Sequence, residues 1–356
     1  MTDAGPDYRP FLAALPKCEH HLHIEGSLSP SLLFSLSARN AIALPSAISD
    51  IAYANVAALE ARYKAFTSLD DFLAYYDRAS RVLIKREDFA DLSYAYMQKA
   101  SEDGIAHTEI SFDLQTHTQR GIAVETVVKG LNDGLKKGEK EFGITFRVIM
   151  CILRHESVQS CVDHVDLALP YYQSGDIHGL GMCSTEKDQH PKKFLPVYQR
   201  AKEVGIEFLT AHAGEEGPAE YVRSALEDLG VTRIDHGVRS VEDEHVLAML
   251  RERKTMLTVC PLSNVALRVV KHLSEVPLRK LLDAGIRFSL NSDDPAYFGG
   301  YLLENYYQVH DNFNFNRTTW ALICRNGIEG SWISEARKQE LISQLGRVTE
   351  EFVTLP

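Results

Sequence analysis

Eight apolar runs, separated by stretches of helical periodicity, constrain the fold of this chain more than any other feature. The runs are rich in β-branched residues, as buried strands are. Strands that alternate with helices build a parallel sheet. In a chain of 356 residues, eight such units favour a closed (β/α)8 barrel of the TIM type over an open doubly wound sheet. The expected strands are Lys17–His23, Ile105–Phe112, Thr145–Leu153, Ile177–Cys183, Glu207–Ala213, Arg233–Val238, Thr255–Cys260 and Ile286–Asn291.

The rest of the chain is predicted to be mainly helical. A helical insertion follows the first strand and extends to about residue 103, and residues 301–356 are expected to finish or cover the barrel. No glycine-rich phosphate loop follows an expected strand, which argues against a nucleotide-cofactor fold. Because no linker, repeat or low-complexity tract interrupts the pattern, we expect residues 1–356 to form a single domain.

One helical face of the insertion is strongly apolar and aromatic. An ordinary core face and a lid over an apolar ligand both explain such a face, and the sequence leaves the two interpretations open. The residues on this face are Phe66, Leu69, Phe72, Leu73, Tyr75 and Tyr76.

Charge and composition exclude several classes of function. The net charge of −11 argues against a general nucleic-acid binder, which needs a basic face. No run approaches the eighteen or so apolar residues of a membrane helix, and the start of the chain lacks a secretion signal. The six cysteines include no Cys-x-x-Cys pair and fit reduced, buried thiols. We therefore expect a cytoplasmic protein, with nuclear residence also open, that binds neither nucleic acid nor membrane. No surface stripe predicts an oligomeric state.

Histidines and carboxylates fall at expected strand ends, where barrels of this kind place their active sites. In an extended strand His21 and His23 point to the same face. His212 and Asp293 come at the ends of the fifth and eighth strands. Three imidazoles and a carboxylate suit Zn²⁺ and leave a position for water, so we predict one zinc ion on these four residues. Iron and cobalt accept the same ligands, and the His-x-His pair alone also fits two solvated or core histidines.

Two further residues are placed to handle protons. Bound zinc lowers the pKa of its water from about 16 toward 7, and the hydroxide formed must then be directed. His236, on the sixth strand, is expected to hold or deprotonate this water, and Glu215 is expected to donate a proton to the substrate. Structural alternatives exist: the glycines beside these residues mark tight turns, and Asp293 with Asp294 caps a helix.

The motifs around these residues resemble those of the adenosine/adenine deaminases of the amidohydrolase superfamily. The resemblance implies a mononuclear zinc barrel in which hydroxide adds to C6 of a 6-aminopurine and ammonia leaves. It also implies that Glu215 protonates N1, that His236 handles the water and that Asp294 contacts N7 and water. The resemblance covers nearly the whole chain and rests on residues 16–28, His212-Ala213-Gly214-Glu215, Asp235-His236-Gly237, Cys260-Pro261-Leu262-Ser263-Asn264 and Ser289-Leu290-Asn291-Ser292-Asp293-Asp294-Pro295.

Within this family, departures from the nucleoside enzymes resemble the adenine deaminases, above all the fungal ones. Where nucleoside deaminases have an aspartate for the ribose hydroxyl, this chain has Glu25, whose carboxylate extends roughly 1–1.5 Å further into the space of a sugar. Ser184 replaces a glycine whose backbone N–H meets N3, so the wall of the purine site is bulkier. We predict that Glu25 accepts a hydrogen bond from the free imidazole N–H of adenine, which adenosine lacks. The resemblance also includes residues 111–121, 212–218 and 294–301.

The expected reaction is therefore zinc-dependent hydrolysis of adenine to hypoxanthine and ammonia, a purine-salvage step. An adenosine deaminase is the nearest alternative, followed by a deaminase of AMP or of N6-substituted purines. A nucleotide needs a cationic phosphate clamp, for which Arg120 and Arg154 are the available residues. Ester or amide hydrolysis does not require the purine-directed Glu215 and Asp294. A catalytically silent metal-binding barrel does not require an acid and a base beside an open coordination position.

Overall fold

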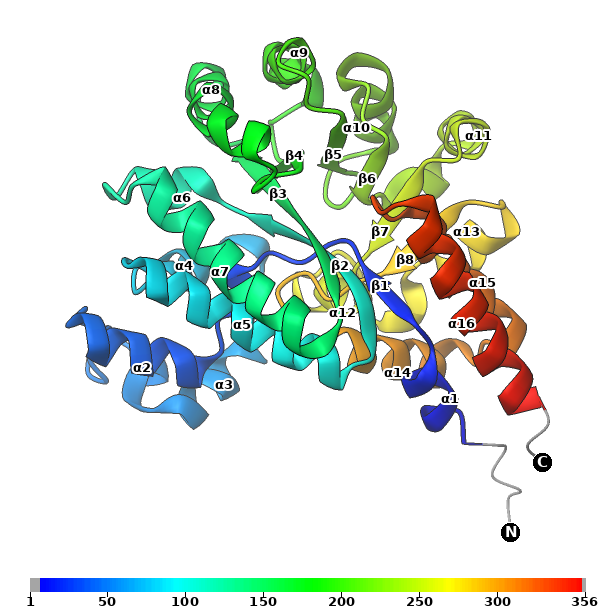
Figure 1. Ribbon diagram of the computed structural model, residues 1–356, viewed down its shortest axis with the longest axis horizontal. Helices are drawn as coiled ribbons and strands as arrows, with labels where there is room; N and C mark the ends of the chain where they lie inside the picture. Colours follow the sequence, from blue (N-terminus) through cyan, green and yellow to red (C-terminus); the bar gives the residue numbers. More distant parts are fainter. Residues whose placement is uncertain (1–6, 354–356) are drawn as a thin grey trace.

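The computed structural model describes residues 7–353 and confirms the predicted α/β barrel. Eight parallel strands pair in the order of the chain, and helices surround them (Figure 1). This order places the carboxyl ends of all strands at one end of the barrel, where loops from distant parts of the sequence meet. The strands are β1 (Lys17–Glu19), β2 (Ile105–Phe112), β3 (Thr145–Leu153), β4 (Gly179–Cys183), β5 (Phe208–Ala213), β6 (Arg233–His236), β7 (Met256–Val259) and β8 (Arg287–Leu290).

The barrel closes through backbone that lies just beyond β1 and β8. The His23 N–H donates to the Asp293 carbonyl at 2.9 Å, and the Asp293 N–H donates to the His21 carbonyl at 3.0 Å. β1 is shorter than predicted, because the His20 N–H donates to the Asn291 side chain at 2.7 Å instead of continuing the ladder. His21 and His23 therefore stand on an irregular segment, beside the end of β8 rather than within a regular strand.

The helical insertion and the C-terminal helices lie where the sequence places them. α2–α5 connect β1 to β2, and α15 packs against β1 and β8 (Figure 1). The helices are α1 (Arg9–Ala14), α2 (Pro30–Asn40), α3 (Val56–Tyr63), α4 (Leu69–Ser80), α5 (Arg86–Glu102), α6 (Leu114–Thr118), α7 (Val124–Phe142), α8 (Val158–Ser174), α9 (Leu195–Glu203), α10 (Ala219–Ser224), α11 (Glu244–Arg253), α12 (Pro261–Ala266), α13 (Leu278–Asp283), α14 (Leu302–Phe313), α15 (Arg317–Gly330) and α16 (Glu335–Val353). Single-turn segments add η1 (Glu25–Ser27), η2 (Ile51–Ala54), η3 (Pro191–Phe194), η4 (Ala225–Leu229), η5 (Val238–Glu242) and η6 (Leu273–Glu275).

Local sequence signals begin and end several of these helices. The Ser29 hydroxyl accepts from the Leu32 N–H ahead of α2, and Pro30 occupies the first turn, where a missing N–H costs nothing. Ser68 caps α4 in the same way. α7 ends at Gly143, whose φ of 74° is the left-handed conformation that glycine adopts without a steric penalty.

A buried polar network fastens the segment after α15 to the barrel. Arg233 pairs with Glu109 at 2.6 Å, donates to the Gly330 carbonyl at 2.9 Å and stacks over the Trp332 ring at 3.9 Å. The charge of each partner compensates the other inside the barrel. All six cysteines are buried and unpaired, as predicted. Within residues 7–353, every helix is too short or too polar to cross a membrane.

Candidate active site

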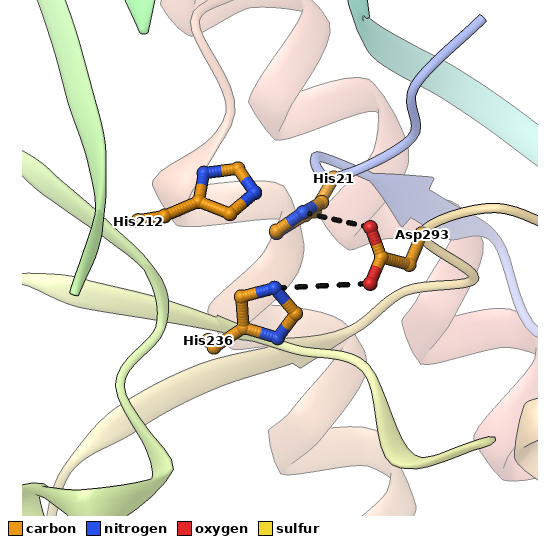
Figure 2. A group of neighbouring side chains, drawn as sticks. All are labelled: His21, His212, His236 and Asp293. Carbon is orange, nitrogen blue, oxygen red and sulfur yellow. Dashed lines mark ion pairs between the residues drawn. The ribbon is translucent and has the colours of Figure 1, made fainter. Parts of the chain in front are cut away.

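Four buried side chains meet at the carboxyl end of the barrel and form a group that could hold a metal ion. Their potential ligand atoms all lie within 4.8 Å of one another. Figure 2 shows His21 and His236 beside the Asp293 carboxylate, with His212 on the other side of His21. One carboxylate oxygen, Oδ1, lies 3.2 Å from His21 Nε2, and the other, Oδ2, lies 3.7 Å from His236 Nε2. The group consists of His21, His212, His236 and Asp293.

His23, the remaining predicted ligand, lies against the same group. Its Nε2 is 3.3 Å from His212 Nε2 and 3.7 Å from Asp293 Oδ1. A tetrahedral zinc ion with bonds of about 2.0–2.1 Å keeps its ligand atoms roughly 3.4 Å apart, so these separations fit zinc. His21 and His23 both face Oδ1, whereas His236 faces Oδ2 of the same carboxylate. The compact group contains His236 and not His23, so the role of His23 as a ligand and of His236 as a separate group stays a prediction.

Two of the predicted ligands have a polar neighbour on their second ring nitrogen, a hydrogen bond for His21 and a carboxylate contact for His212. His21 Nδ1 lies 3.0 Å from the Thr258 hydroxyl, and His212 Nδ1 lies 3.3 Å from Asp235. Thr258 in turn donates to Asp235 at 3.1 Å. These contacts leave Nε2 of each ring to face the centre, as in histidines that bind metals. His21 Nε2 makes no hydrogen bond with the residues from 7 to 353, which fits an atom that binds an ion.

Burial and mutual charge set the protonation states of this group. Burial and the neighbouring His21 hold the pKa of His236 well below its usual value, so its imidazole is neutral and can accept a proton. The same two causes lower the pKa of His212 to about 4. Burial acts to raise the pKa of Asp293, but His21 and the other imidazoles outweigh it and hold this pKa well below its usual range. Burial acts to lower the pKa of His21, but the Asp293 carboxylate outweighs it, so the net shift of this pKa is upward. A metal ion binds the neutral form of an imidazole, so binding of a cation would displace the proton from His21.

Glu215 and Asp294 are buried carboxyl groups whose pKa values shift upward, opposite to that of Asp293. Burial, together with the charge of Asp293, raises the pKa of both well above the usual range. Glu215 Oε2 lies 3.6 Å from His236 Nε2. Glu215 Oε1 and Asp294 Oδ1 have no hydrogen-bond partner among residues 7–353. A protonated carboxyl group with a free oxygen is suited to donate to a substrate, as predicted for Glu215.

A cavity of about 640 Å³ opens directly onto these groups. This volume lies within the range typical of small-molecule sites. α4 forms part of its wall, so the aromatic face predicted for the insertion covers the cavity as well as packing into the core. Residues that line the cavity include His23, Leu69, Phe72, Leu73, Tyr76, Asp113, Ser184, His212, Glu215, His236, Asp293 and Asp294.

Three residues of the site hold a backbone conformation that favours glycine. The φ angles of Ser184, His236 and Asp293 are 78°, 61° and 64°. Such residues cost of order 1–3 kcal/mol each and persist where the surrounding structure enforces them, often at active sites. For Ser184, this φ is the left-handed conformation that glycine adopts without a steric penalty. Its hydroxyl lies 2.8 Å from His155 Nδ1 at the edge of the cavity.

Glu25 is buried behind the cavity wall. Its Oε1 accepts hydrogen bonds from His117 Nε2 at 2.8 Å and from the Asp113 N–H at 3.1 Å. Burial acts to raise the pKa of Glu25, but the hydrogen bond from His117 outweighs it, so the net shift is downward. Glu25 is absent from the residues that line the cavity, and its predicted contact with adenine stays a prediction.

Asp113 is a carboxylate of the cavity wall that the sequence analysis did not single out. It accepts a hydrogen bond from the Tyr76 hydroxyl at 2.9 Å. Burial and the nearby Glu25 raise its pKa. A signal was available, because Asp113 directly follows β2 at the same end of the barrel as the other site residues.

Comparison with known proteins identifies the family. The model of the family described as "Adenosine deaminase" matches residues 16–348. The chain belongs to the adenosine deaminase family. The predicted resemblance is thereby confirmed.

The similarity to individual members of this family extends over nearly the full length of this chain. Adenine deaminase from Candida glabrata is 49% identical over 96% of this chain and 98% of its own. The crystal structure of adenine deaminase from Arthrobacter aurescens has a TM-score of 0.89 at 41% identity and covers 94% of this chain and 99% of its own. An amidohydrolase from Burkholderia ambifaria, solved with bound Zn, has a TM-score of 0.85 at 25% identity, over 99% of this chain and 98% of its own.

A glycine in this member of the adenosine deaminase family makes room for Asp294. A Cβ atom on Gly26 would lie 2.0 Å from Asp294 Oδ1 and 2.7 Å from its Cα. Gly26→Ala is therefore expected to displace Asp294 and lower kcat/KM on the substrate about a hundredfold, by the misplacement of one site group. The matched control is Gly346→Ala, because nothing lies within 4 Å of a Cβ there. Equal activity of the two variants would contradict a role of Asp294 in the reaction.

Proposed function

We propose that this chain hydrolyses adenine to hypoxanthine and ammonia, with one zinc ion bound by His21, His23, His212 and Asp293. The observation that carries the proposal is the full-length similarity to adenine deaminases, including the one from Candida glabrata at 49% identity. The buried donor set supports a metal site, and the related Burkholderia ambifaria structure contains Zn. Zinc takes this combination of imidazole and carboxylate ligands and leaves a position open.

The residues of the site supply the proton transfers of such a hydrolysis. When bound, the zinc ion lowers the pKa of a water molecule and so makes a nucleophile available at neutral pH. The neutral His236 accepts a proton from the attacking water, and Glu215 gives its proton to N1 of the ring. As the C6–O bond forms, the π electrons of the C6–N1 bond move to the protonated N1, and C6 becomes tetrahedral. The amino group then takes up the proton held by His236 and leaves as ammonia when the C6–N6 bond breaks, and the C6 hydroxyl returns its proton to Glu215 to form the carbonyl of hypoxanthine. Asp294 orients the substrate through N7, and Ser184 donates its backbone N–H to N3.

The choice of adenine over adenosine is assigned to the two carboxylates at the end of the cavity near β2. Adenine has a free imidazole N–H where adenosine carries its sugar. Asp113 faces the cavity, and Glu25 lies behind it and holds the Asp113 backbone. A buried acceptor left without a partner costs about 1–3 kcal/mol, and sites built to bind an N–H reject analogues that lack it. The pair therefore favours adenine, with Asp113 nearer to the ligand.

This assignment predicts a change of substrate ratio. Asp113→Ala is expected to lower kcat/KM for adenine by one to two orders of magnitude and to leave the low rate on adenosine nearly unchanged. Glu25→Asp tests the original prediction for Glu25, namely that adenosine turnover rises relative to adenine. Asp77→Ala is the matched control, because Asp77 lines the cavity and is exposed at its edge. If the ratio stays constant in both test variants, neither carboxylate selects the substrate.

A nucleotide substrate is less well supported, because Arg154 is not among the residues that line the cavity and the Arg120 guanidinium is bonded to backbone. Arg154 is fully buried and donates to the His212 carbonyl at 3.0 Å. Arg120 lines the cavity, but its guanidinium donates to backbone carbonyls of Thr116, Arg81 and Leu83 at 3.0–3.3 Å. A phosphate clamp requires free donors.

The activity itself is tested by ammonia release from adenine before and after metal removal. Activity that is lost with a chelator and restored by zinc supports the proposal. A protein that never releases ammonia, and that unfolds when the chelator removes its metal, is instead a silent metal-binding barrel.

A further inference from the structure

The short segment that carries Glu215 is held by a second buried glutamate. Glu186, in the loop after β4, directs its carboxylate to the backbone of this segment: Oε1 accepts from the Glu215 N–H at 3.4 Å, and Oε2 accepts from the Gly217 N–H. Its side chain is only 1% exposed. A buried carboxylate whose two oxygens accept hydrogen bonds from backbone N–H groups holds that stretch of backbone in place.

Arg154 compensates the charge of Glu186 and reaches the metal site. Arg154 is 0% exposed, and its Nη1 lies 3.6 Å from Glu186 Oε1. Its Nη2 donates to the carbonyl of His212 at 3.0 Å. The pair therefore contacts the backbone of a predicted zinc ligand and the backbone of the predicted acid, three residues further along the chain.

The geometry leaves little freedom to the segment between His212 and α10. A Cβ atom on Gly217 would lie 2.4 Å from Glu186 Oε2, so only glycine permits this approach. A second hydrogen bond joins the same two segments, because the Glu216 carboxylate accepts from the Glu186 N–H at 3.4 Å. From η5, just after β6, Arg239 donates to the Glu216 carbonyl at 2.6 Å. The segment is thus held from both neighbouring loops.

The acid itself has no such support. Glu215 Oε1 makes no hydrogen bond with residues 7–353, so the place of the carboxyl group depends on the backbone that bears it. Catalytic groups must be held within about 0.5 Å of the productive geometry. We propose that Glu186, with Arg154 as its counter-charge, is a positioning residue that fixes Glu215 for proton donation; this rests on the proposed deaminase function.

A double-mutant cycle on the zinc-loaded protein tests the proposal. Glu186→Gln loses one acceptor and is expected to lower kcat on adenine at least tenfold, with KM and zinc content close to those of the wild type. In a Glu215→Gln background the same change is expected to have no further effect, because the group that it positions is already gone. Glu220→Gln is the matched control: Glu220 of α10 also bonds to the β4 loop, through His190 at 2.9 Å, but contacts neither Glu215 nor Gly217.

The outcomes separate the proposal from its premise. Equal losses of kcat in both backgrounds would overturn the proposal, because Glu186 would then act independently of Glu215. If Glu186→Gln fails to fold with the Arg154 charge unpaired, Glu186→Asp repeats the cycle: it keeps the charge but withdraws the carboxylate from the two N–H groups, and the same criteria apply. A wild-type protein that does not deaminate adenine would refute the proposed function instead.

Discussion

Replacing His23 with alanine is expected to leave the purified protein without zinc and without measurable activity. Replacing His236 is expected to leave zinc in place and to lower kcat by two orders of magnitude or more. The reason is the division of the Asp293 carboxylate: His23 and His21 face Oδ1 at 3.7 and 3.2 Å, whereas His236 faces Oδ2 at 3.7 Å. Loss of one ligand of four lowers the affinity for the ion, because that affinity depends on ligand number and geometry. The measurements are the zinc-to-protein ratio and kcat on adenine.

The exposed His245 of α11 provides the control, because His245→Ala removes an imidazole that belongs neither to this group nor to the cavity lining. The opposite result, with zinc lost from the His236 variant and retained by the His23 variant, would make the group drawn in Figure 2 the ligand set. The roles of His23 and His236 would then be exchanged.

Glu215→Gln is expected to slow turnover of adenine by a factor of a hundred or more and to leave zinc stoichiometry unchanged. Burial raises the pKa of Glu215 well above its usual range, which favours the protonated side chain that can donate. Glutamine has nearly the same shape but no acidic proton. A hundredfold loss corresponds to about 2.7 kcal/mol of transition-state stabilisation. Single-turnover rates on adenine measure the effect directly.

The same Glu220→Gln control applies to this prediction, since Glu220 is 41% exposed and lies outside the cavity. Loss of zinc from the Glu215 variant would contradict the assignment of Glu215 as an acid, and so would an unchanged rate.

The barrel could be predicted from the sequence because parallel strands that are buried on both faces appear as continuous runs of apolar residues. β2 and β3 begin and end at the predicted residues, Ile105–Phe112 and Thr145–Leu153. The first strand was predicted too long. There the hydrogen bond from His20 to Asn291 decides where the ladder stops, and these residues lie 271 positions apart in the chain. No local pattern contains that contact.

For the site, residue types at strand ends predicted which side chains meet at the end of the barrel, but not the neighbours that modify each of them. The sequence shows that residue 25 is a glutamate, with a longer side chain than aspartate. It does not show the hydrogen bond between Glu25 and His117, which lies 92 positions away. The pairing of Glu186 with Arg154 could not be predicted either, because a buried ion pair produces no periodic pattern in the sequence. The aromatic face of α4 was visible, but the cavity beneath it depends on loops from the whole barrel.

The central claim is most directly tested by initial rates on adenine and adenosine, measured side by side with zinc-loaded protein by loss of aminopurine absorbance and by ammonia release. We expect adenine to be deaminated faster by orders of magnitude. Equal rates, or a faster rate on adenosine, would contradict the assignment of the substrate while leaving the fold and the family in place.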